Sequence, residues 1–334
     1  MAGYVVAGLL LLAVAGFLFE KRRRRTHPVP PGYQEDLELP HAAEWELYHN
    51  ALSLCSMKTR FCLAELEIPY VGHHIDLIET GAYETLRPKL LRVNPGGTVP
   101  VLLHNGHPIY ESHEQIRYAA RFVPEGIPAL VPSDSAEREE MEAWVDRTTL
   151  TNPLEEPGKS AGNAVPGQTL PLFCTMIEKV PLHRIGEGLL FHFDKRRPVM
   201  FILFKLLGIR RLPRLGPLTD AIGKTRDILC GFLDELDERL EENGGPWIMG
   251  EQFTLADVGW VVILERIRQA SAENVFLAPA DRPHVAAYWE RLKARPSYRR
   301  AILDHDHPLI DYGRDRLAEA KTTDPNVRML LEGA

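Results

Sequence analysis

The sequence predicts an α/β domain followed by an all-α domain, with one membrane-spanning helix preceding both. Strand-like and helix-like segments alternate between residues 44 and 123, and most of the later sequence repeats apolar residues at helical spacing. Residues 2–19 form one uncharged apolar run. The net charge of −7 gives no reason to expect a nucleic acid as a partner.

The apolar run at residues 2–19 is just long enough to cross a bilayer as a helix, and "EKRRRR" follows it directly. A cleaved signal peptide would carry its positive charge before the apolar run. We therefore predict an uncleaved transmembrane anchor with a basic flank over residues 1–25. The positive-inside rule then places the rest of the chain in the cytoplasm. Residues 26–43 contain four prolines and little periodicity, which predicts a linker.

The α/β domain is expected over residues 44–123. "EWELYH" (44–49) and "YVGHHIDL" (70–77) are typical of strands, with a helical spacing of apolar residues between them. Asn105-Gly106 separates two apolar runs and is a strong hairpin signal. Ser112-x-x-Gln115 predicts a capping box that opens a helix reaching about residue 122. The resulting order β-α-β-(α)-β-β-α implies a mixed sheet with helices on its faces.

The helical domain is expected over residues 134–304. Helical periodicity covers residues 135–151 and 219–242, and Thr254-x-x-Asp257 caps a helix apolar enough to be central. Between these helices an extended segment spans residues 157–216, of which 157–171 is loop-like. Residues 305–334 are expected to form a C-terminal tail.

Residues 198–216, "PVMFILFKLLGIRRLPRLG", are strongly apolar with a basic end. One interpretation is a buried helix that covers the domain. The other is an in-plane membrane contact, apolar on one face and cationic on the other. The predicted N-terminal anchor makes the second interpretation more plausible than it would be in a protein without one.

Cysteine and histidine give little sign of a metal. Four cysteines without a close pair indicate neither a metal site nor a disulfide framework, and a reducing compartment fits better. Cys62, Cys174 and Cys230 are expected to be core or incidental residues. His73-His74 and His305-x-His307 have no evident third ligand, so no metal site is predicted.

Three short motifs carry a family resemblance. They are Ser53-Leu54-Cys55-Ser56 at the turn into the first helix, Thr98-Val99-Pro100 before the third strand, and Glu111-Ser112 before the next helix. With "FTLAD" (253–257) and "RPSYRRA" (295–301), they resemble the soluble glutathione transferases over residues 44–302. The resemblance implies a thioredoxin-like N-terminal domain and a helical C-terminal domain.

"SLCSMKTR" (53–60) looks most like the Ser-x-Cys branch of this family. That branch includes maleylacetoacetate isomerase of the zeta class and the tetrachlorohydroquinone reductive dehalogenases, and "CSMKTR" is especially close to the latter. The resemblance implies glutathione as cofactor, a cis peptide before Pro100 and a homodimer. Ser53 would hydrogen-bond the glutathione thiolate, and Val99 would pair with its backbone. Glu111 would take its ammonium and Ser112 its γ-glutamyl carboxylate.

Cys55 has two possible roles in such a protein. A helix N-terminus and Lys58 would lower its pKa and make it the nucleophile of a glutathione-dependent reductive step on a hydrophobic electrophile. Alternatively Ser53 dominates, in conjugation or cis–trans isomerisation, and Cys55 supports it or merely fills space. A non-catalytic membrane-associated protein, similar to the ganglioside-induced differentiation-associated proteins, is the remaining alternative. The retention of Ser53, Val99-Pro100 and Glu111-Ser112 together favours an enzyme.

Overall fold

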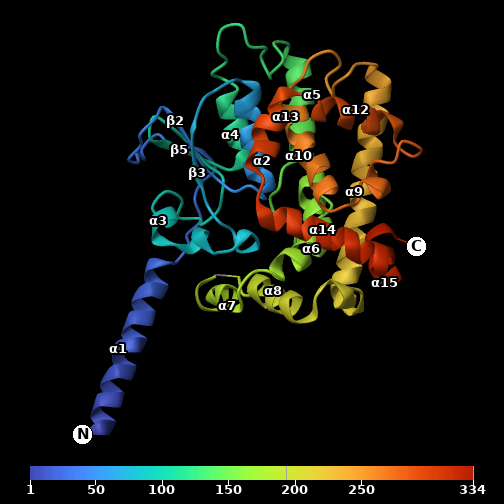
Figure 1. Cartoon of the computed structure of the whole chain (residues 1–334). Coiled ribbons are helices and arrows are strands. Elements are labelled where there is room, and N and C mark those ends of the chain that lie inside the picture. Colours follow the sequence, from blue (N-terminus) through green and yellow to red (C-terminus); the bar gives the residue numbers. More distant parts are fainter. Residues whose placement is uncertain (193, 334) are drawn as a thin grey trace.

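The computed structural model describes residues 1–192 and 194–333 and contains an isolated N-terminal helix, a sheet domain and a larger helical domain (Figure 1). Helix α1, Ala2–Arg23, projects away from the body. The sheet domain consists of β1 Gly32–Tyr33, β2 Trp45–His49, α2 Leu54–Glu65, β3 Val71–His74, the 3₁₀ turns η1 Ile78–Thr80 and η2 Glu84–Leu86, α3 Pro88–Leu91, β4 Val101–His104, β5 His107–Tyr110 and α4 Ser112–Ala119.

The strand order β1-β5-β4-β2-β3 makes a mixed sheet, as the sequence predicts. Among the strands of the described residues, only β2 and β3 pair in parallel, and α2 makes the crossover between them. Asn105 and Gly106 both have positive φ, as a two-residue type I′ hairpin between β4 and β5 requires. Along β4 the side chains alternate between the two faces. Leu102 faces the core shared with the helices, while Val101 and Leu103 face a smaller cluster on the other side.

Residues 26–43 are not a free linker. The backbone N–H of His27 donates to the carbonyl of Pro95 at 2.8 Å, and β1 pairs antiparallel with β5. The Tyr33 ring stacks on Tyr118 with ring centroids 5.0 Å apart, and Leu39 packs on the outer face of the sheet. The segment therefore adds an edge strand to the sheet before the chain enters β2.

The helical domain contains more helix than the sequence predicts. Its elements are α5 Ser135–Asp146, α6 Ala161–Ile177, α7 Leu182–Phe191, α8 Arg196–Leu207, η3 Ile209–Arg214, α9 Gly216–Asn243, α10 Leu255–Gln269, α11 Glu273–Phe276, α12 Pro283–Lys293, α13 Pro296–Ala301, η4 Leu303–His305, α14 Pro308–Thr323 and α15 Pro325–Glu332. The expectation of a loop at 157–171 was wrong, because most of that stretch lies in α6. The predicted C-terminal tail, residues 305–334, is largely helical.

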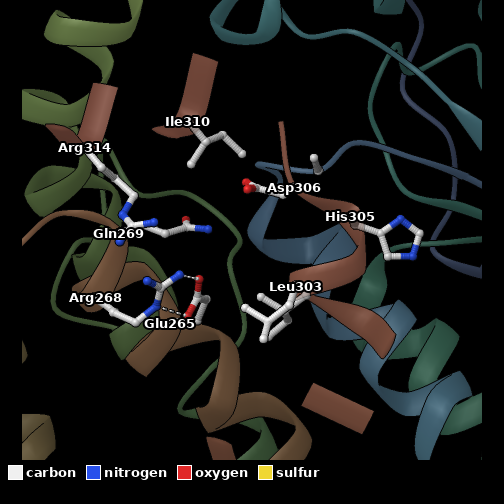
Figure 2. Close-up of a pocket in the computed structure, with 10 residues that line it drawn as sticks. Glu265, Arg268, Gln269, Leu303, His305, Asp306, Ile310 and Arg314 are labelled. Carbon is white, nitrogen blue, oxygen red and sulfur yellow. Dashed lines mark hydrogen bonds and ion pairs between the residues drawn. The ribbon is translucent and has the colours of Figure 1, made fainter. Parts of the chain in front are cut away.

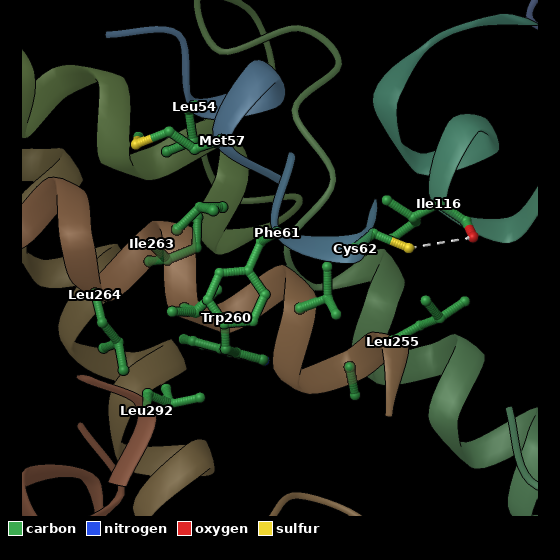
Figure 3. Close-up of a cluster of buried hydrophobic side chains, with 14 of the residues drawn as sticks. Leu54, Met57, Phe61, Cys62, Ile116, Leu255, Trp260, Ile263, Leu264 and Leu292 are labelled. Carbon is green, nitrogen blue, oxygen red and sulfur yellow. Dashed lines mark hydrogen bonds between the residues drawn. The ribbon is translucent and has the colours of Figure 1, made fainter. Parts of the chain in front are cut away.

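Helix α10 is the centre of the molecule and joins its two domains. The capping box between Thr254 and Asp257 opens it, as predicted. Trp260, in its second turn, is fully buried against Trp144 of α5. On another side α10 packs on α2, where Met57 and Phe61 are fully buried (Figure 3). One continuous apolar core therefore fixes the start of α2 relative to the helical domain.

Candidate active site

The turn between β2 and α2 is held by Asn50, which is fully buried. The side-chain oxygen of Asn50 accepts from the backbone N–H groups of Leu52 (2.9 Å) and Ser53 (3.2 Å). Its amide nitrogen donates to the Ile75 carbonyl and to the Thr80 hydroxyl, both at 2.9 Å. Asn50 thus fixes the point where α2 begins. The sequence analysis missed it, although an Asn just after a strand is a common turn residue.

Ser53 is the N-cap of α2, the position predicted for it. Its hydroxyl oxygen accepts a hydrogen bond from the Ser56 N–H at 3.2 Å. The hydroxyl hydrogen is not used in that bond, and the side chain is only half-buried. Ser53 can therefore donate to an anionic sulfur that lies at the N-terminal end of the helix.

Cys55 lies in the first turn of α2, half-buried, with the Ser112 hydroxyl close enough to its thiol to act on the pKa of that thiol. The expected low pKa was wrong. Burial raises the pKa of the Cys55 thiol above its ordinary value, and the nearby Lys58 charge and the Ser112 hydroxyl only partly offset this. Loss of water around the sulfur outweighs the favourable charges near it.

Lys58 lies one turn below Cys55 and is almost completely buried. Its ammonium donates to the Thr148 carbonyl at 2.9 Å and lies 3.3 Å from the Thr148 hydroxyl. Burial lowers the pKa of Lys58 to about 8, while Cys55 acts in the opposite direction. The residue therefore ties α2 to the helical domain and places a cation beneath the thiol.

We expect Lys58→Met to slow alkylation of Cys55 by iodoacetamide. Without the cation, the thiolate is less favoured, so the pH midpoint of alkylation should rise by roughly one unit and the rate at neutral pH should fall about tenfold. Rates are read from the mass of the Cys55 peptide, and the exposed Lys224→Met serves as control. An unchanged midpoint in Lys58→Met would show that this charge does not act on Cys55.

The Val99-Pro100 peptide is cis, as the family resemblance implies. The Pro100 carbonyl accepts from the side-chain amide of Gln115 at 3.0 Å. The same amide nitrogen donates to the Ile109 carbonyl (2.8 Å), and its oxygen accepts from the Thr59 hydroxyl (2.7 Å). Buried Gln115 therefore connects the start of β4 with β5, α2 and α4.

The predicted capping box at Ser112 and Gln115 was wrong, because Gln115 makes these other bonds. The N-cap of α4 is Glu111, which has a φ of +66° and no side-chain cap. Its carboxylate is exposed and makes no ion pair within the described residues. Ser112, the first helical residue, is buried with its hydroxyl near the thiol of Cys55. A carboxylate available for a cation therefore stands beside a serine that faces Cys55.

Two cavities lie near this region. One of about 110 Å³, shown in Figure 2, is lined by residues such as Glu265, Arg268, Gln269 and Asp306. It is smaller than the roughly 300 Å³ at which ligand pockets begin. The other has about 390 Å³ and is lined by residues that include His113, which follows Ser112, and also Asp146 and Ser160. Its size and its position beside Ser112 make it the better candidate for a ligand.

One group of three possible metal ligands does form, contrary to the expectation that the histidine pairs have no third ligand. Ligand atoms of His74, Asp76 and His307 lie within 4.8 Å of one another. Nε2 of His74 is 3.1 Å from the Asp76 carboxylate, and Nδ1 of His307 accepts from the Leu309 N–H as the cap of α14. A metal would have to displace these bonds, so the cluster serves the structure as it stands.

The comparisons with known proteins agree with this geometry. Residues 52–121 match the family of glutathione S-transferase N-terminal domains, and residues 224–299 match that of the C-terminal domains. The chain therefore belongs to the glutathione S-transferases by both of its domains.

Among curated proteins, the chain is 26% identical to a tetrachloro-p-hydroquinone reductive dehalogenase of Sphingobium chlorophenolicum, over 77% of this chain and 95% of that protein. It is also 26% identical to glutathione S-transferase TCHQD of Arabidopsis thaliana, over 77% and 89%. The β-etherase LigF of Sphingobium sp. shares the fold, with a TM-score of 0.63 and 17% identity over 78% of this chain and all of that one.

Proposed function

We propose that this protein uses glutathione to conjugate a hydrophobic electrophile or to remove a group from it reductively. One observation carries the proposal. The start of α2 carries Ser53 as its cap and Cys55 in its first turn, with the Ser112 hydroxyl near the Cys55 thiol. Gln115 joins the same helix, through Thr59, to the Pro100 carbonyl. Glutathione transferases and a reductive dehalogenase among the relatives support the same class of chemistry.

Each residue of the site has a part in holding glutathione. In this proposal the backbone of the half-buried Val99 pairs with the glutathione peptide as an added strand. The Glu111 carboxylate takes the γ-glutamyl ammonium. The Ser112 hydroxyl and the free N–H groups at the start of α4 take the adjoining carboxylate. Ser53 then donates its hydroxyl hydrogen to the glutathione sulfur and favours the thiolate.

In the reductive version, glutathione first replaces a group on the electrophile and forms a thioether. The Cys55 thiolate then attacks the thioether sulfur. The carbon–sulfur bond breaks, its electron pair stays on carbon, and that carbon takes a proton. A second glutathione thiolate attacks the resulting mixed disulfide, which releases oxidised glutathione and restores the Cys55 thiolate. The two glutathiones supply the two electrons that the product gains.

Intact mass tests the role of Cys55. The full chain in detergent is incubated with oxidised glutathione, and wild type is compared with Cys55→Ser. A single adduct of about 305 Da on wild type alone is the expected result, because a reactive thiolate exchanges with the disulfide. No adduct on either protein would remove Cys55 as the nucleophile.

Conjugation or isomerisation centred on Ser53 is the second candidate, and the raised pKa of Cys55 is the observation that favours it. This candidate predicts that glutathione binds and no adduct forms on Cys55. If glutathione does not bind at all in a calorimetric titration, the non-catalytic alternative takes its place.

We further propose that α1 anchors the protein in a membrane with its catalytic domains in the cytoplasm. The most apolar 18-residue window of Gly3–Arg23 has a mean hydropathy of 2.0, and none of it is covered by the rest of the protein. Arg22–Arg25 follow on the side that the positive-inside rule assigns to the cytoplasm. The expected result is that the full chain stays with vesicles after alkaline washing, whereas a chain without residues 1–25 is released. Release of the full chain would exclude a spanning helix.

A homodimer is proposed from the family fold alone. Light scattering of the detergent-solubilised chain should give twice the protein mass of 37.8 kDa after correction for bound detergent. A mass of one chain would refute it.

A further inference from the structure

Helices α7 and α8 expose an unusual number of apolar side chains. After α1, thirteen large apolar residues among the described ones are exposed, and six of them fall between residues 182 and 206. We call these six the α7–α8 face: Leu182, Leu189, Leu190, Val199, Leu203 and Leu206. Contiguous exposed apolar residues of this kind mark a contact surface in a soluble domain.

The opposite sides of both helices are already packed. Gly188 of α7 lies against the Tyr83 ring so closely that an added Cβ would come within 2.6 Å of it. Phe201 and Phe204 of α8 are buried, and Arg197 forms an ion pair with the fully buried Glu79. The two helices are thus seated firmly on the sheet domain and the core. The exposed leucines form a second apolar side with no partner inside the described chain.

Helix α1 leaves the body beside this face (Figure 1). The Arg24 guanidinium is 2.5 Å from the Glu187 carboxylate of α7 and lies over the Phe191 ring at 4.4 Å. Phe17 contacts the same ring, with centroids 6.0 Å apart. At 1.5 Å of rise per residue, Phe17 lies about 10 Å along α1 from Arg24. The end of α7 therefore lies beside the apolar part of α1.

Cations surround the face. Arg22 and Arg23 end α1, Arg25 follows it, and Lys195 lies close enough to Lys21 for the two charges to interact. Beyond α8, the exposed Arg210, Arg211 and Arg214 make no ion pair within the described residues. Arg23 is paired with Glu20, but the other cations named here make no ion pair within the described residues. Apolar side chains bordered by such cations are what a helix lying in an anionic lipid interface presents.

We propose that the α7–α8 face lies in the surface of an anionic bilayer. The contacts of Arg24 with Glu187 and Phe191 fix the orientation of the rest of the protein relative to α1. This inference rests on the proposed membrane anchor. The leucines enter the boundary between headgroups and acyl chains, while the arginines of η3 and of the end of α1 contact anionic headgroups. A hydrophobic electrophile dissolved in the bilayer would then be close to the catalytic domains.

Quenching by lipids brominated near the headgroup tests the proposal. The full chain is reconstituted into phosphatidylserine-containing vesicles as wild type, Leu203→Trp and Met329→Trp. Met329 is also exposed but lies on α15, so it is the matched control. We expect the emission added at residue 203 to fall at least twofold and that added at residue 329 to remain. Equal quenching at the two positions would overturn the proposal.

A charge reversal tests the contact with α1. Glu187→Lys places two cations together, so the emission added at residue 203 should lose most of its quenching while the protein still pellets with the vesicles. The quenching at residue 203 should also be weaker in vesicles of phosphatidylcholine alone. If quenching at residue 203 survives both changes, the proposed role of the Arg24–Glu187 contact is wrong. Loss of pelleting would instead refute the anchor, and neither result bears on the glutathione adduct at Cys55.

Discussion

Asp257→Ala is expected to cost most of the stability of the protein. The Asp257 side chain is fully buried at the start of α10. One oxygen accepts from the Thr254 N–H at 2.8 Å, and the other from the Ile248 N–H (3.1 Å) and the Tyr288 hydroxyl (2.9 Å). Alanine leaves three buried donors without an acceptor, at about 1–3 kcal/mol each. The free energy of unfolding should fall by roughly 4 kcal/mol or more, and Tm by about 6 °C or more.

The pH dependence of stability identifies the carboxyl group itself. Burial raises the pKa of Asp257 to about 6, although the hydrogen bonds act against this. The folded protein therefore binds a proton between pH of about 4 and about 6 that the unfolded chain has released, so this group makes stability fall as pH rises through that window. Asp257→Asn keeps the shape and should remove this trend. Urea unfolding at two pH values inside the window measures it, and an unchanged trend in Asp257→Asn would assign it to another group.

The parts of the fold that the sequence predicts are those with a strong local signal. Asn105-Gly106 favours one turn type regardless of its surroundings, and Thr254 with Asp257 satisfies the orphan N–H groups of α10 within a few residues. The position of Ser53 at a helix start is of the same kind. In each case the residues that determine the structure are neighbours in the chain.

The predictions from the sequence are wrong where contacts between residues far apart in the chain determine the structure. Strand β1 has two residues, and only its pairing with β5 makes it a strand. Helix α6 contains Pro166 and Pro171, which favour a loop locally, yet packing against α9 and α14 keeps it helical. The C-terminal helices did carry a usable signal. Pro308 and Pro325 each stand at the first helical position behind a capping residue.

The candidate site shows the same division. Sequence motifs place Ser53, Cys55, Pro100 and Ser112 individually, but the pKa of Cys55 depends on how tightly α2, α4 and α10 close around it. That closure removes water from the sulfur, and no pattern within "SLCSMKTR" reports it. The Gln115 contacts likewise span the sheet and α2, so its local resemblance to a capping-box residue was misleading.

Three substitutions at Ser53 separate its two roles, the cap of α2 and the hydrogen bond to sulfur. Ser53→Ala removes both the cap of α2 and the hydrogen-bond donor to the sulfur. We expect it to lose about 1 kcal/mol of stability and, with the donor to the sulfur gone, roughly 100-fold in glutathione-dependent turnover. Ser53→Thr keeps both groups and should stay near wild type. Ser53→Asp still accepts the Ser56 N–H and suits the positive end of the helix, so the fold should keep its stability.

The decisive readout is the pKa of bound glutathione, followed by the ultraviolet absorbance of its thiolate against pH. In Ser53→Asp the thiolate loses its donor and faces a carboxylate instead, so that pKa should rise further than in Ser53→Ala, by about one to two units over wild type. A stable Ser53→Asp protein with a wild-type thiolate titration would assign Ser53 to the helix cap alone. The ionisation of glutathione would then depend on the N–H groups of α2 and on the charges of Lys58 and Arg266, because these are the remaining positive groups near the start of that helix.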